Sequence, residues 1–102
     1  MTSSSFDYGQ AVATVQIDND RVRVTQWSFP PGTQTGWHRH ELDYVVVPTV
    51  AGRMSYETAD GGASRELVVG ESYAREAGSE HNVINKTDTE FAFVEIELKP
   101  QG

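Results

Sequence analysis

Three histidines are the side chains of this 102-residue sequence whose types and spacing best suit chemistry: His38, His40 and His81. One residue separates His38 from His40, and in a β-strand this spacing places both imidazole rings on the same face. Two adjacent imidazoles supply half of the ligands of a typical four-coordinate metal site. An isolated pair of this kind is more often a pair of exposed surface histidines, so the spacing alone leaves both interpretations open.

The elements that must position these histidines are predicted to be β-strands. Turn-forming residues recur roughly every eight to twelve residues, which is typical of an all-β sandwich or barrel. No long window keeps the apolar period of a helix. Pro48 cannot donate a hydrogen bond to a strand ladder, so it marks a bulge or a sheet edge. The expected strands cover residues 11–17, 21–29, 36–40, 43–50, 53–58, 63–69, 71–75, 81–85 and 90–98.

Two spaced patterns of glycine and histidine surround these residues. In the first, Gly32 is followed by five residues and then by His38 and His40. In the second, five residues follow the leading glycine, and a further glycine, a histidine and an asparagine come at fixed spacings: Gly70, Gly78, His81 and Asn85. The two patterns span residues 32–85. In their order and spacing they resemble the two motifs of the cupin superfamily, with Glu76 where the family has proline.

The resemblance implies a double-stranded β-helix, an all-β, jelly-roll-like barrel that holds a metal ion inside one end. His38, His40 and His81 would lie on neighbouring strands and present three imidazoles to one divalent transition metal: iron, zinc, nickel or manganese. The segment His-Arg-His-Glu-Leu-Asp-Tyr-Val-Val-Val-Pro also resembles a group of small bacterial cupins associated with β-alanine degradation.

The sequence departs from the family pattern at the glutamate that follows the first two histidines. The family spacing places Tyr44 or Val45 at that position, and neither is a carboxylate. Tyr44 has the same parity as the two histidines, so it can face the metal as a catalytic acid, base or hydrogen-bond donor, or it can simply pack in the barrel. Asp43 takes the position only if the register shifts. We therefore expect a three-histidine site that leaves coordination positions open.

Such a site favours a metalloenzyme that acts on a small carboxylate-bearing metabolite, with oxygenase-type chemistry as the first choice. A non-redox isomerase or lyase is the alternative, in which the metal polarises a carbonyl and Tyr44 moves a proton. A non-catalytic small-molecule binding protein is the third hypothesis. Arg53 and Arg75 could hold a substrate carboxylate, although solvated surface arginines are the more common case.

Length and composition limit the remaining possibilities. The chain suffices for one domain, and we expect a flexible arm over residues 1–9 and a single cupin domain over residues 10–102. The absence of cysteine excludes disulfides and thiolate sites. The formal net charge of −7 argues against nucleic acid binding. Because neither a signal peptide nor a membrane-spanning run is visible, we expect a cytoplasmic protein without a membrane partner.

The last expected strand alternates between two sets of apolar residues. One set shares a face and comprises Ala92, Val94, Ile96 and Leu98. The opposite face carries Phe91 and Phe93, followed by two glutamates. Apolar surface at these two phenylalanines would be covered by a second copy of the chain, so we expect a homodimer.

Other residues are expected to serve structure. Trp37 has the opposite parity to His38 and is expected to pack. Asn85 should bond backbone groups at a turn. Met54, Tyr56 and Phe29 are core candidates. Positive φ angles are expected at four glycines: Gly32, Gly52, Gly70 and Gly78.

Overall fold

The computed structural model describes residues 8–101, and these residues form eleven strands and no helix. The strands are β1 (Gly9–Gln10), β2 (Val12–Asp18), β3 (Val22–Phe29), β4 (Thr33–Gln34), β5 (His38–Arg39), β6 (Asp43–Val50), β7 (Gly52–Thr58), β8 (Gly61–Leu67), β9 (Tyr73–Arg75), β10 (Glu80–Ile84) and β11 (Phe91–Leu98). Each of the nine expected strands is present in this part of the chain. The sequence analysis missed β1 and β4, because two residues are too few to show an alternating pattern.

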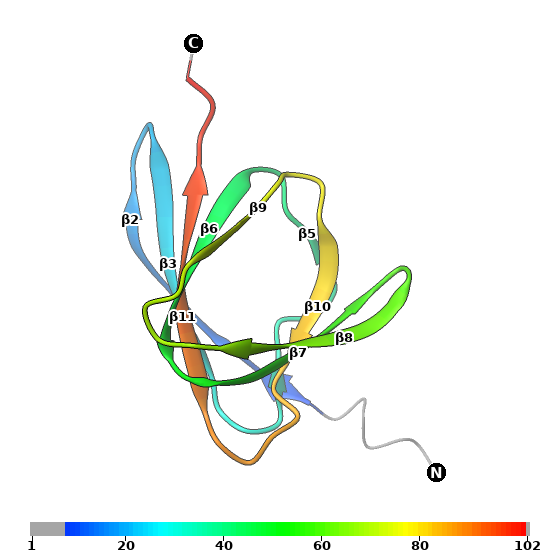
Figure 1. Ribbon diagram of the computed structural model, residues 1–102. Helices are drawn as coiled ribbons and strands as arrows, with labels where there is room; N and C mark the ends of the chain where they lie inside the picture. Colours follow the sequence, from blue (N-terminus) through cyan, green and yellow to red (C-terminus); the bar gives the residue numbers. More distant parts are fainter. Residues whose placement is uncertain (1–7, 102) are drawn as a thin grey trace.

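The strands form two sheets that face each other as a barrel (Figure 1). One sheet has the order β2-β3-β11-β6-β9, and the other has the order β1-β4-β10-β7-β8 with β5 beside β10. This is the predicted all-β, double-stranded β-helix. No membrane-crossing helix occurs among residues 8–101. Most of the predicted arm, residues 1–7, lies outside the described residues, whereas Gly9 already pairs with Thr33.

The inner face of the five-stranded sheet carries the aromatic residues of β11. Phe91 and Phe93 are buried in the core, whereas Leu98 on the opposite face is 44% exposed. The expectation that Phe91 and Phe93 offer apolar surface to a second copy is therefore wrong. Alternation reveals which residues share a face, but both faces of β11 carry apolar residues, so it does not reveal which face points inward. The outward apolar face is that of Val94, Ile96 and Leu98.

A cluster of phenylalanines forms part of the buried core. The Phe29 ring stacks on Phe91 and Phe93, with ring centres 4.8 Å and 5.5 Å away. Gly52 lies against this cluster, where an added Cβ atom would be 2.7 Å from the Cβ atom of Phe91. Gly52 thus serves close packing and not the expected positive φ, which occurs at Gly32, Gly70 and Gly78.

The structure confirms two of the predictions for structural residues and contradicts a third. Asn85 is fully buried and donates hydrogen bonds to the carbonyl oxygens of Phe29 and Thr89, both at 2.8 Å. Pro48 lies at a register shift between β6 and β11, which confirms the predicted bulge. Trp37 is 54% exposed, so the prediction that it packs is wrong. It lies just before the two-residue strand β5 and outside any strand.

Candidate metal centre

Two neighbouring strands bring the three histidines together. His38 of β5 lies directly opposite His81 of β10 in the antiparallel register. His40 follows β5, where its backbone N–H donates to the Ser79 carbonyl oxygen at 2.8 Å and its carbonyl oxygen accepts from the Gly78 N–H at 2.7 Å. The loop before β10 thereby fixes the backbone of His40 next to His81. Gly78 has a φ of 98°, which a side chain would disfavour.

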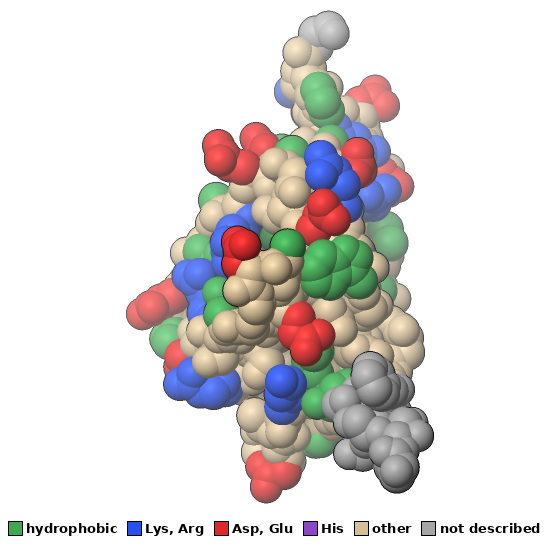
Figure 2. Space-filling view, turned by 90° about the vertical axis from the view of Figure 1, so that its right-hand side faces the viewer, with side chains coloured by type: hydrophobic (Ala, Val, Ile, Leu, Met, Phe, Trp, Pro, Cys, Tyr) green, Lys and Arg blue, Asp and Glu red, His purple; other side chains and the backbone are tan. Residues whose placement is uncertain are grey.

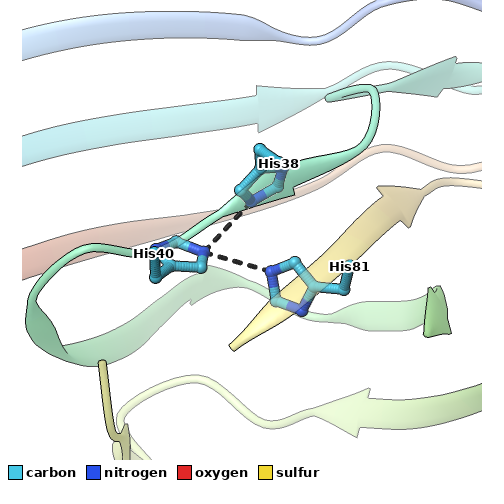
Figure 3. A group of neighbouring side chains, drawn as sticks. All are labelled: His38, His40 and His81. Atoms are coloured by element: carbon cyan, nitrogen blue, oxygen red, sulfur yellow. Dashed lines mark hydrogen bonds between the residues drawn. The ribbon is translucent and has the colours of Figure 1, made fainter. Parts of the chain in front are cut away.

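The imidazole rings of the three histidines converge on one point (Figure 3). The Nε2 atom of His40 lies 3.0 Å from that of His38 and 3.1 Å from that of His81. Two nitrogen ligands that bind one ion at about 2.0–2.1 Å are separated by about 2.9–3.4 Å. The spacing of these nitrogen atoms therefore fits a single transition-metal ion, which would satisfy the three lone pairs at once.

The surroundings of the rings favour the neutral, metal-binding form. His38 Nδ1 lies 2.9 Å from the Gly36 carbonyl oxygen, which can only accept, so Nδ1 carries a proton and Nε2 is the ring nitrogen turned toward the other two histidines. Burial, and then the nearby His38, lower the pKa of His40 and of His81 to about 4. Both rings are thus uncharged at neutral pH. Figure 2 views the side of the barrel formed by β5, β8 and β10, and no histidine is visible on that surface.

Tyr44 faces the barrel interior beside the histidines, as its parity predicts. The side chain is 3% exposed, and its ring stacks on His40 with ring centres 4.0 Å apart. Burial raises the pKa of Tyr44 to about 12, with a smaller contribution from Glu95. The hydroxyl is therefore protonated at neutral pH and can donate a hydrogen bond. Asp43 does not take the place of the family glutamate, because its exposed carboxylate accepts from the Ala77 N–H at 2.8 Å.

A cavity of about 420 Å³ opens onto the three histidines and Tyr44. Arg75 lines this cavity and is partly buried. Its guanidinium lies 5.9 Å from the centre of the Tyr56 ring, and it forms no ion pair with the described residues. Arg53, by contrast, is a surface residue that pairs with Glu66 at 3.1 Å. Only Arg75 of the two candidate arginines can therefore meet a ligand in the cavity.

The sequence analysis missed five charged residues of the cavity wall: Arg23, Arg39, Glu41, Glu95 and Glu97. Arg23 binds Glu97 through two hydrogen bonds of 2.7 Å and 3.1 Å. Burial, and then the neighbouring Glu97, raise the pKa of Glu95 to about 7, against the opposing effects of Arg23 and of a hydrogen bond from Trp27. The sequence feature that could have identified Glu95 and Glu97 as cavity residues was their shared parity with Phe91 and Phe93.

Glu95 and Glu97 also lie close to the candidate metal centre. One carboxylate oxygen of each and one ring nitrogen of His40 all lie within 4.8 Å of one another. Because Glu97 is already bound by Arg23, the three histidines are the better set of metal ligands. The glutamates instead line the cavity wall beside His40.

Comparison with known proteins agrees with this geometry. Residues 25–97 match the family described as the cupin domain. A curated protein from Pseudomonas aeruginosa strain PAO1, "Beta-alanine degradation protein BauB", is 54% identical over 90 residues, which cover 88% of this chain and 95% of that protein.

Solved structures show the same fold. A cupin domain from Bordetella pertussis Tohama I is 58% identical, with a TM-score of 0.89 over 91% of this chain and 97% of that one. An RmlC-like cupin family protein from Methanocaldococcus jannaschii, described as a double-stranded β-helix, has a TM-score of 0.75 at 13% identity over 91% of this chain and 84% of that one. The second likeness concerns the fold alone.

Proposed function

The chain belongs to the cupin family, and we propose that it is a metalloenzyme that binds one divalent transition metal through His38, His40 and His81. The observation that carries this proposal is the convergence of three Nε2 atoms, with contacts of 3.0 Å and 3.1 Å, on a cavity of about 420 Å³. Iron, zinc, nickel and manganese all suit imidazole ligands. A bound metal supplies a Lewis acid and, as iron, oxygenase-type redox chemistry.

We further propose that the substrate is a small metabolite with a carboxylate group. Arg75 offers a charged donor in the cavity that no described carboxylate occupies. Tyr44 offers a protonated hydroxyl beside His40. Together the two side chains can hold and orient a carboxylate, and Tyr44 is the residue we assign to catalysis, as a hydrogen-bond or proton donor.

The name of the Pseudomonas aeruginosa relative indicates a metabolic process in which such a substrate occurs. That protein is called a β-alanine degradation protein, and we propose that the present chain acts in the same process. β-Alanine and the acids formed from it carry a carboxylate on a short carbon chain. This size suits the cavity and the two carboxylate-binding groups described above.

Oxygenase-type chemistry is our first choice, with a non-redox isomerase or lyase and a non-catalytic binding protein as alternatives. Metal identity separates the first two, because iron together with oxygen uptake fits an oxygenase, whereas zinc, nickel or manganese fits a non-redox reaction. Tight capture of a ligand without turnover fits the third. We also propose a homodimer, now through the outward apolar face of Val94, Ile96 and Leu98. The cytoplasmic location stays a prediction.

Elemental analysis of protein purified without a His tag tests the metal centre. We expect about one divalent ion per chain and a sharp loss of metal in His81→Ala. Glu80→Ala is the matched control, because this neighbouring side chain of β10 is exposed and pairs only weakly with Arg39 at 3.6 Å. Full metal occupancy in His81→Ala would show that the assignment of the ligands is wrong.

A further inference from the structure

Glu95 is a cavity-wall carboxylate without a charged partner among the described residues. Its neighbour Glu97 is neutralised by Arg23 through two hydrogen bonds. Glu95 forms no ion pair in the described part of the chain, although it lines the same cavity as the histidines. An uncompensated carboxylate in a partly buried position is costly, so its presence calls for an explanation.

The strand register gives Glu95 uncharged cross-strand neighbours. It pairs with Val46 of β6 on one side and with Thr25 of β3 on the other. Tyr73 and Val15 continue this cross-strand row at its two ends. None of these neighbours can neutralise a carboxylate, and the nearby Arg23 is bound by Glu97. A ligand in the cavity can supply a cationic group of its own.

Groups that attract an anion line the same cavity. The three histidines, when they bind a cation, and Arg75 attract an anion. A carboxylate oxygen of Glu95 lies within 4.8 Å of a His40 ring nitrogen, so a ligand bound beside His40 needs only a short chain to reach Glu95. The cavity therefore presents groups that attract an anion and one carboxylate that can bind a cation, and a short molecule beside His40 can reach both.

We propose that Glu95 binds the ammonium group of a short-chain amino carboxylate whose carboxylate lies on the side of Arg75 and the histidines. This inference rests on the proposed function and narrows it, because a zwitterion replaces the general class of small carboxylates. Glu95 is then a specificity-determining residue. An acid of the same length without an ammonium group leaves Glu95 unpaired and binds less well.

The experiment compares β-alanine with propionate, which has the same carbon chain and lacks the ammonium group. Binding to zinc-loaded protein is measured by titration calorimetry at constant pH for the wild type, Glu95→Gln and Glu66→Gln. Glu66 is the matched control, because it loses the same charge from an exposed position outside the cavity, where it pairs with Arg53 at 3.1 Å. Zinc content is measured in the same samples.

We expect the wild type and Glu66→Gln to bind β-alanine about tenfold or more tightly than propionate, as a charge-assisted hydrogen bond implies. Glu95→Gln should lose this preference, keep its affinity for propionate and keep its zinc. An unchanged preference in Glu95→Gln overturns the ammonium site and leaves the proposed function intact. Loss of zinc in Glu95→Gln also overturns it, because Glu95 would then be a metal ligand. Failure of zinc-loaded wild type to bind either acid refutes carboxylate binding itself, and the ammonium site with it.

Discussion

The substitution Glu95→Gln should stabilise the metal-free protein at neutral and alkaline pH. The pKa of Glu95 rises from its ordinary value of 4.5 to about 7 in the folded chain, chiefly through burial. A raised carboxyl pKa means that the folded state favours the protonated form. Wild-type stability contributed by this group is therefore present below pH 4.5 and is lost as the pH rises through about 7. Glutamine keeps the shape of the side chain and removes the charge.

The size of this effect follows from the pKa. Each pKa unit corresponds to about 1.4 kcal/mol, so the rise from 4.5 to about 7 corresponds to about 3 kcal/mol. Glu95 borders a cavity that water enters, and solvent screening reduces the penalty. We therefore expect the free energy of unfolding of Glu95→Gln to exceed that of the wild type by about 1 to 3 kcal/mol at pH 8. The difference should disappear near pH 4.5.

Urea unfolding between pH 4.5 and pH 8, with a chelator present in all samples, measures the difference. The chelator keeps the histidines metal-free in both proteins, so their titration cancels in the comparison. Glu71→Gln is the matched control, since Glu71 is exposed in the turn before β9. It should change stability little at any pH. The reasoning is refuted if the difference between wild type and Glu95→Gln does not depend on pH, or if Glu95→Gln is the less stable protein at pH 8.

Three further predictions concern other parts of the molecule. Tyr44→Phe keeps the ring that stacks on His40, so calorimetry should show normal metal content and carboxylate binding weaker by about 1 kcal/mol; unchanged binding would remove the hydroxyl from the site. Gly52→Ala should lower the free energy of unfolding by about 1–3 kcal/mol, because its Cβ atom would lie 2.7 Å from Phe91, whereas Gly62→Ala, with a nearest atom at 3.7 Å, should cost little in the same urea titration. Sedimentation should give a dimer at micromolar concentration that Ile96→Lys converts to monomer; a wild-type monomer would contradict the homodimer.

The sequence by itself determined the strands and the candidate metal ligands. Strands can be predicted because turn residues and alternation act locally, and β2, β3, β6, β7 and β11 each lie within two residues of their expected limits. The histidines could be found because the His38–His40 spacing fixes two rings on one face and the spaced motif adds His81. Tyr44 followed from the same parity. The strands and the shared face of His38, His40 and Tyr44 are properties of short segments, whereas His81 was found through the resemblance to the second cupin motif.

Tertiary structure decided which faces point inward and which charges share the cavity. Both faces of β11 are partly apolar, and the packing of Phe91 and Phe93 on Phe29, with Gly52 close by, turned Glu95 and Glu97 inward. Arg23 and Glu97 are 74 residues apart in the chain and pair only because β3 lies beside β11. The charge of Glu95 likewise depends on burial by strands distant in sequence. Since electrostatic interactions and burial act through space, no local pattern could have revealed the Arg23–Glu97 ion pair or the raised pKa of Glu95.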